Sequence, residues 1–116
     1  MSDEVATAVL EPPVQRRDPK QDKPKRQKPW AVIVLNDDEH TYAYVIETLQ
    51  KVFHYEVEKC FQLTKQIDAT GQAVVWSGSR EVAELKRDQI KGAGKDFYAE
   101  AGPVMYPLGC TIEEMP

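Results

Sequence analysis

An amide and two carboxylates follow one another directly after an apolar run, as Asn36, Asp37 and Asp38. The preceding residues 30–35 are apolar throughout and β-branched at three positions, a pattern typical of a buried strand. Polar groups at the end of such a strand are held by a rigid scaffold, so they can face a ligand rather than only water. We therefore place the functional site at this point of the chain.

Several kinds of site are compatible with residues 36–39. Asn and Asp often bond to their own backbone, so the segment can be an ordinary solvated loop. A divalent-metal loop needs ligands at alternating positions and a glycine turn, and no such pattern follows here. A phosphoacceptor receiver domain also places paired acids after its first strand, but the remaining 87 residues or so are too few for its five βα units. Neither of the last two interpretations is favoured.

The first 29 residues differ in composition from the rest of the chain. They hold five of the eight prolines, no aromatic residue, seven basic and five acidic side chains. Such a segment buries too little apolar surface to fold, so we predict a flexible Pro/Lys-rich extension over residues 1–29 and one core domain over residues 30–116. The core has fourteen acidic and eight basic side chains. This charge disfavours nucleic acid and anionic membranes as partners and favours a cationic ligand.

The sequence carries no pattern typical of metal binding, catalysis or membrane insertion. Cys60 and Cys110 belong to no C-x-x-C or Cys/His pattern, so we interpret them as reduced core residues. His40 and His54 stand alone, and no nucleophile with a placed base or phosphate loop is found. We therefore expect no enzyme, metal site or cofactor. The absence of a ~20-residue apolar span and of a secretory signal predicts a cytoplasmic protein.

The spacing of apolar residues predicts three helices. The first covers residues 42–53 and begins after Thr41, whose hydroxyl suits an N-cap. The second covers residues 56–68 and is ended by Gly71, and the third covers residues 80–91. The residues expected to face inward on the third helix are Val82, Ala83 and Ile90.

Short apolar runs predict the strands. Residues 30–35, 73–76 and 108–113 are expected to form three of them, while residues 95–107 are irregular apart from a short helical turn at 96–100. The resulting order is β-α-α-β-α-β, without regular βαβ alternation. This order predicts an α+β fold, in which the helices pack on one face of a three-stranded antiparallel sheet.

Five blocks of sequence resemble the ClpS adaptor family in one order along the chain. The family pattern begins N-D-D-x-T-P-M-x-F-V and continues V-L-Q-K-x-F, R-E-I-A-E-T-K and P-L-x-C-T-x-E. The matching blocks here are Asn36-Asp37-Asp38 with residues 45–53, Glu58-Lys59 with Gln62-Leu63, Gly71, residues 80–86 and residues 107–113. The resemblance covers residues 30–113.

The resemblance implies a bacterial, non-enzymatic adaptor that binds the first residue of an N-degron and delivers its protein to a AAA+ Clp unfoldase and protease. Asn36 and Asp37 match the family residues that accept hydrogen bonds from the α-ammonium group. An ammonium group removed from water is costly unless such acceptors replace its hydration. The family's third acceptor is a histidine, and Asp68 stands at its position. We expect Asp68 to keep that role with a full negative charge.

The family's side-chain pocket is the part from which this sequence departs most. The matching residues are Tyr42, Val45, Thr64, Ile67 and Leu108, with His40 and Thr41 at the rim. Tyr42 and Thr64 replace two methionines of the family, while His40 replaces a threonine and Thr41 a proline. Tyrosine is rigid with a polar tip, whereas methionine is flexible, so we expect a reshaped pocket with an exposed Tyr42.

The resemblance also implies how the substrate is delivered. Glu81 and Lys86 match charged positions through which the family docks on the N-terminal domain of a ClpA- or ClpC-like unfoldase. The extension matches the family's flexible N-terminal segment, and we expect a monomer. Residues 91–106 are several residues longer than the family needs; such a connection is tolerated at little cost or can border the pocket. The alternative function is an interaction module that binds no N-terminus, similar to the C-terminal domain of the ribosomal stalk protein.

Overall fold

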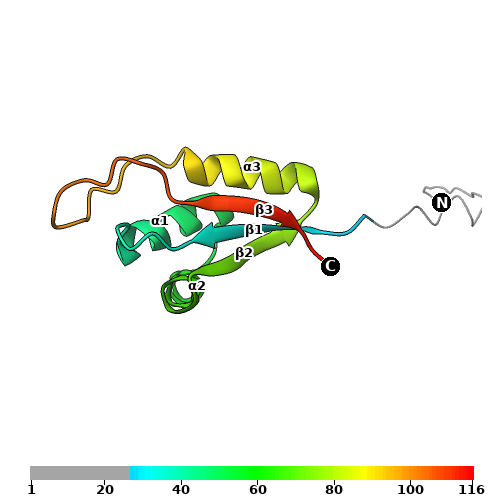
Figure 1. Ribbon diagram of the computed structural model, residues 1–116, viewed down its shortest axis with the longest axis horizontal. Coiled ribbons are helices and arrows are strands. Elements are labelled where there is room, and N and C mark those ends of the chain that lie inside the picture. Colours follow the sequence, from blue (N-terminus) through cyan, green and yellow to red (C-terminus); the bar gives the residue numbers. More distant parts are fainter. Residues whose placement is uncertain (1–26) are drawn as a thin grey trace, which may run out of the picture.

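The computed structural model describes residues 27–116 and contains three strands and three helices within them (Figure 1). In chain order these are β1 (Trp30–Leu35), α1 (Tyr42–Phe53), α2 (Val57–Thr70), β2 (Gln72–Gly78), α3 (Arg80–Lys91) and β3 (Cys110–Glu114). The predicted order of elements is confirmed. The predicted extension lies almost wholly outside the described residues, so the division of the chain at residue 29 stays a prediction.

Strand β1 is the centre of an antiparallel sheet with the order β2-β1-β3. Val32 pairs with Trp76 on one side and with Ile112 on the other. The register with β2 shifts between Val32 and Ile33. All four residues from Ala31 to Val34 are buried, which agrees with the unbroken apolar sequence of this central strand.

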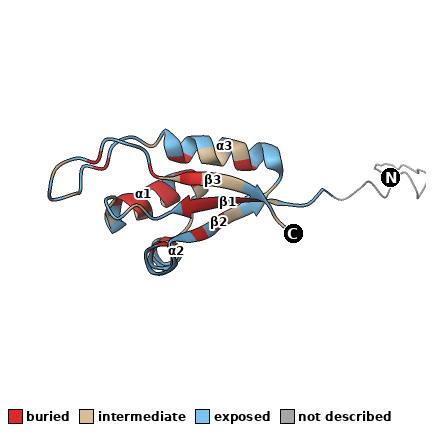
Figure 2. Ribbon diagram, in the orientation of Figure 1, coloured by how far each residue is buried: buried red, intermediate tan, exposed pale blue. Residues whose placement is uncertain are grey.

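The helices pack on one face of the sheet and enclose the core with it (Figure 2). Helix α2 contacts β2, α3 contacts β1 and β3, and α1 lies against both other helices. Cys60 and Cys110 are buried and unpaired, as predicted. Other core side chains are Val32, Val34, Tyr44, Val45, Leu49, Val52, Ile67, Val75, Ala83, Ile90 and Leu108. No helix within residues 27–116 combines the length and apolarity that a membrane crossing requires.

The helix ends follow the predicted capping residues. The Thr41 hydroxyl accepts a hydrogen bond from the Tyr44 N–H at 3.1 Å, which confirms the N-cap of α1. Gly71 ends α2 with a φ of 92°, a conformation that glycine adopts without steric cost. Helix α2 therefore continues to Thr70, two residues beyond its predicted end. The inward position of Val82 was wrong: this residue lies about 100° around the helix from the buried Ala83 and is exposed.

The connection between α3 and β3 is more ordered than predicted. Asp96 and Val104 form an antiparallel bridge, in which each backbone N–H donates to the other's carbonyl oxygen, at 3.0 and 2.8 Å. The predicted helical turn at residues 96–100 was wrong, because this bridge holds Asp96 in an extended pair. The chain turns instead near Gly102, which has a φ of 118°. Residues 95–107 thus form a hairpin-like loop that extends from one end of the domain (Figure 1).

Candidate functional site

The end of β1 lies beside the last turn of α2 and the residues that lead into β3. The Asn36 N–H donates to the Gly71 carbonyl oxygen, and the Leu35 N–H donates to that of Gly109, both at 2.9 Å. These two backbone hydrogen bonds bring the segments that carry Asp68 and Leu108 to the end of β1. The predicted parts of the site, although distant in sequence, therefore meet at one end of the sheet.

The acidic loop, which comprises residues 36–39, is held by hydrogen bonds within itself. The Asn36 side-chain N–H donates to Asp38 Oδ1 at 3.0 Å, and Asn36 Oδ1 accepts from the Asp38 N–H at 3.2 Å. Asp37 Oδ1 accepts from the N–H groups of Glu39 and His40, both at 2.9 Å. These contacts agree with a self-bonded loop. Since an amide or carboxylate oxygen can accept two hydrogen bonds, Asn36 Oδ1 and Asp37 Oδ2 retain capacity for a ligand.

The charge of Asp37 is favoured by its surroundings. Burial alone would raise the pKa of this carboxyl group. The two backbone N–H groups of His40 and Glu39 and the His40 side chain outweigh burial and lower the pKa below the ordinary value of 3.8. Asp37 is therefore a carboxylate at neutral pH, as recognition of a cation requires.

Tyr42 closes over Asp68 from the first position of α1. Its hydroxyl donates to Asp68 Oδ2 at 2.8 Å, which raises the pKa of Tyr42. The Tyr42 ring packs edge-on against Phe61, with centroids 6.2 Å apart. As predicted, Tyr42 is exposed. We call this hydrogen bond between α1 and α2 the Tyr42–Asp68 latch.

The position of Asp68 is unfavourable for the helix that carries it. Asp68 lies in the last turn of α2, where the helix dipole is negative, and no basic residue stands in that turn. A carboxylate at this position opposes the dipole and so carries a cost in folding. The cost favours a role for Asp68 outside the helix.

The other predicted pocket residues lie in the core of this structure. Val45, Thr64, Ile67 and Leu108 are all buried. The Thr64 hydroxyl donates to the Cys60 carbonyl oxygen one turn earlier, at 2.7 Å, so it is satisfied within α2. A side chain entering among these residues has to displace Tyr42 or repack the core. Their role as a pocket stays a prediction.

The predicted rim residues, His40 and Thr41, link the acidic loop to residues 91–106, which we call the long connection. The two ring nitrogens of His40 lie against the Asp37 carboxylate and, at 3.0 Å, against the Tyr106 carbonyl oxygen. Thr41 donates to the Asp96 carboxylate from its backbone N–H at 2.7 Å and from its hydroxyl at 3.1 Å. His40 and Thr41 are thus joined to residues more than fifty positions later in the chain.

Asp96 and Tyr106 are two residues of this region that the sequence did not single out. Asp96 is fully buried, and its Oδ1 also accepts from the Tyr98 N–H at 2.8 Å. Tyr106 has a pKa raised to about 12, first by desolvation and then by a hydrogen bond to Glu39 and the charges of Asp37 and Glu39. The one available signal was the excess length of residues 91–106.

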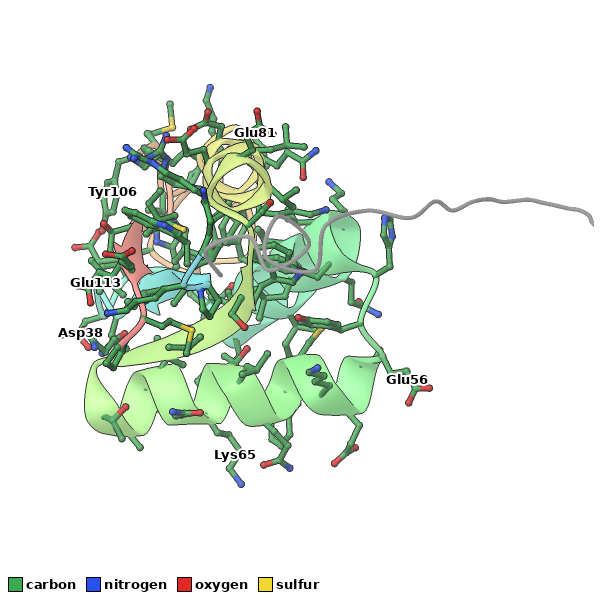
Figure 3. All side chains as sticks on the ribbon, turned by 90° about the vertical axis from the view of Figure 1, so that its right-hand side faces the viewer. Asp38, Glu56, Lys65, Glu81, Tyr106 and Glu113 are labelled. Carbon is green, nitrogen blue, oxygen red and sulfur yellow. The ribbon has the colours of Figure 1, made fainter. Side chains whose placement is uncertain are left out.

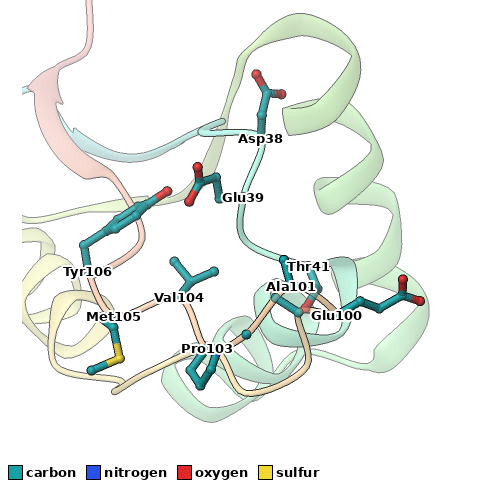
Figure 4. Close-up of a pocket in the computed structure, with 11 residues that line it drawn as sticks. Asp38, Glu39, Thr41, Glu100, Ala101, Pro103, Val104, Met105 and Tyr106 are labelled. Carbon is teal, nitrogen blue, oxygen red and sulfur yellow. The ribbon is translucent and has the colours of Figure 1, made fainter.

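A hollow of about 730 Å³ opens between the acidic loop and this connection (Figure 4). One wall comes from Asp38, Glu39 and Thr41, and the other comes from residues 99–106. Tyr106 points toward Glu39 across the hollow (Figure 4).

The predicted docking residues lie on α3, apart from the acidic loop. Glu81 stands in the first turn of α3 (Figure 3). The Lys86 ammonium group donates to the Val52 carbonyl oxygen at 2.8 Å, in the last turn of α1. Lys86 therefore has a structural contact of its own, and the exposed Leu85 lies next to it on the helix.

Comparisons with known proteins point to one family. The model of the family described as "ATP-dependent Clp protease adaptor protein ClpS" matches residues 25–111. The ATP-dependent Clp protease adapter protein ClpS of Alkalilimnicola ehrlichii is 33% identical over 90 residues, which are 78% of this chain and 78% of that protein. That of Nautilia profundicola is 34% identical over 88 residues, which are 76% of this chain and 84% of the relative.

A solved structure matches the fold as well. The structure of Agrobacterium tumefaciens ClpS2 bound to L-phenylalaninamide superposes with a TM-score of 0.62 and 29% sequence identity. The match covers 78% of this chain and 100% of that one. Sequence and fold therefore agree on the same set of relatives.

Proposed function

Because the chain belongs to the ClpS family of ATP-dependent Clp protease adaptor proteins, we propose that it binds the N-terminal residue of substrate proteins and delivers them to a AAA+ Clp unfoldase. The observation that supports the proposal is the hydrogen bond from the Asn36 N–H to the Gly71 carbonyl oxygen, which brings the last turn of α2, with Asp68, to the end of β1. The ClpS2 relative binds L-phenylalaninamide, which offers an α-amino group beside a large apolar side chain. The same chemistry suits three oxygen acceptors beside an apolar core.

In the proposed complex, the α-ammonium group donates its three protons to Asn36 Oδ1, Asp37 Oδ2 and the Asp68 carboxylate. Two of these groups are charged, so the cation is matched by carboxylates and not only by dipoles. The Tyr42 ring moves off Asp68, and the substrate side chain enters beside Val45 and the other buried pocket residues. In this proposal Tyr42 covers the pocket when no ligand is bound and moves aside when the substrate side chain enters.

The remaining parts of the proposal concern delivery. The adaptor acts by binding alone and carries out no reaction. Helix α3, with Glu81 and Lys86, docks on the N-terminal domain of a ClpA- or ClpC-like unfoldase. The kind of unfoldase, the monomeric state and the cytoplasmic location stay predictions from the sequence.

The experiment that tests the proposal compares peptides whose α-amino group is free or acetylated. Peptides led by Phe, Leu or Ala are labelled at the C-terminus and titrated with the full chain by fluorescence anisotropy. Acetylation removes the cation, so we expect at least one free peptide to bind about tenfold or more tightly than its acetylated form. Equal affinities for every pair would exclude the ammonium site and favour an interaction module of the same fold.

Replacing Tyr42 with phenylalanine should strengthen binding of the free peptide. The Y42F variant keeps the ring against Phe61 but loses the hydroxyl that occupies Asp68. The ligand then no longer displaces the hydrogen bond from the Tyr42 hydroxyl, so we expect about two- to tenfold tighter binding. The measurement is the same titration, with Y98F as the control because Tyr98 bonds to Glu47 instead. Weaker binding by Y42F alone would mean that the hydroxyl contacts the ligand directly.

A further inference from the structure

The hollow between the acidic loop and the long connection begins where the proposed α-amino site ends. Asp38 and Glu39, which line one wall, directly follow Asn36 and Asp37 in the chain. Asp38 lies near the last turn of α2, at the end of the helix away from Glu56 (Figure 3). An extended peptide advances about 3.3–3.6 Å per residue, so a few residues beyond a bound N-terminus suffice to reach along this wall.

The opposite wall is held in place by contacts to α1 and the acidic loop. Asp96 bonds to Thr41, and the Tyr44 hydroxyl donates to the Gly94 carbonyl oxygen at 2.6 Å. The Tyr98 hydroxyl donates to Glu47 at 3.0 Å, and the Tyr106 carbonyl oxygen lies against His40. The connection is therefore a fixed part of the site rather than a free loop.

The lining of the hollow combines an apolar surface with negative charge. Pro103, Val104 and Met105 supply apolar groups, and Met105 is largely exposed, at 63%. Glu39 and Glu100 supply carboxylates alongside Asp38, while none of the residues that line the hollow is basic (Figure 4). Lysine and arginine fit such a surface, because their alkyl stems can lie on apolar groups while the charged end reaches a carboxylate.

We propose that this hollow is a second subsite, which binds the substrate residues directly after the N-terminal one and prefers lysine or arginine there. The inference rests on the proposed function, because the α-amino site fixes where the substrate chain begins. The long connection and the acidic loop form the subsite together. Met105 and Glu100 belong to the long connection, and Glu39 belongs to the acidic loop.

The test uses three peptides that share a free N-terminal phenylalanine and differ only at positions two to four, which are all Lys, all Gln or all Glu. A single exposed charge pair contributes little to the binding free energy, but the contributions of several pairs add up. At low salt we therefore expect the Lys peptide to bind the full chain about five- to tenfold more tightly than the Glu peptide. The double substitution Glu39→Gln with Glu100→Gln should reduce this ratio to about two, with little change for the Gln peptide. The Met105→Ala substitution should weaken binding of the Lys peptide and of the Gln peptide to the same extent.

The matched control is Glu56→Gln, at the other end of α2, where the side chain makes no capping hydrogen bond. It should leave the Lys-to-Glu ratio as in the parent. A parent that does not distinguish the peptides, or a double variant that keeps the full ratio, would overturn the subsite while amine-dependent binding stands. If none of the three peptides binds better than its acetylated form, the proposed function and the subsite fail together.

Discussion

Replacing Asp68 with asparagine should weaken binding of a peptide with a free α-amino group about 4- to 12-fold, because the amide oxygen can still accept from the ammonium group but lacks the charge that roughly doubles the strength of such a hydrogen bond. The same substitution should slightly raise the free energy of unfolding. Asp68 opposes the dipole in the last turn of α2, where no basic residue offsets it. Removing the charge relieves ~0.3–1 kcal/mol of unfavourable interaction, while the amide oxygen of asparagine can still accept the hydrogen bond from the Tyr42 hydroxyl. Binding and stability are thus expected to change in opposite directions.

Two further variants separate the charge of Asp68 from its position. The Asp68→His substitution restores the residue that the family has here and should recover part of the binding above the ordinary pKa of histidine. The Asp88→Asn substitution removes an exposed carboxylate from α3 and should leave the affinity unchanged. Peptide titration and urea denaturation measure the two quantities. A D68N variant that binds like the parent, or that loses stability together with binding, would show that Asp68 serves the fold rather than the ligand.

The sequence predicted best those elements whose boundaries depend on local chemistry. The bounds of β1 and α1 were predicted to the residue, because an apolar run meets a polar loop at Asn36 and a capping hydroxyl stands at Thr41. The end of α2 was missed by two residues. Helix α2 ends at Thr70 because Gly71 adopts the left-handed conformation, so Asp68 lies within the last turn of the helix.

The connection to β3 could not be predicted in the same way. The backbone bridge from Asp96 to Val104 is accompanied by a long-range contact, in which the Asp96 carboxylate accepts from Thr41, fifty-five positions earlier. Local propensity favoured a helical turn at residues 96–100, and this long-range contact overrode it. A buried aspartate between Lys95 and Phe97 has no local pattern that would distinguish it from a surface residue.

The members of the candidate site stay a prediction from the sequence, and their arrangement could not be predicted from it. The motif placed Asn36, Asp37 and Asp68 in one region, and backbone hydrogen bonds at the end of β1 bring their segments together. The latch between Tyr42 and Asp68 depends on how α1 packs against α2, which residue types alone do not determine. The long connection supplies the remaining wall, and only its excess length hinted at such a role.

Replacing Asp96 with alanine should destabilise the domain more than any surface substitution. The Asp96 carboxylate is fully buried at the start of α1, where the positive end of the helix dipole favours a negative charge. It accepts from the Thr41 N–H, the Thr41 hydroxyl and the Tyr98 N–H. Its loss leaves two backbone donors without their partner, so we expect a cost of about 3 kcal/mol and a fall in Tm of roughly 12–20 °C.

Asparagine at this position should be nearly as harmful as alanine, although it has the same shape. The two backbone donors bond to different oxygens: Thr41 N–H to Oδ2 and Tyr98 N–H to Oδ1. An asparagine side chain has one oxygen, so its amide group has to face one of the two donors. Thermal denaturation of D96A and D96N, with D88N as the control, measures the fall in Tm. Tryptic cleavage after Lys95 should also become faster in both variants, because the long connection loses the contact of Asp96 to Thr41. A D96N variant as stable as the parent would show that one oxygen suffices, and that the connection is held by its other contacts to α1.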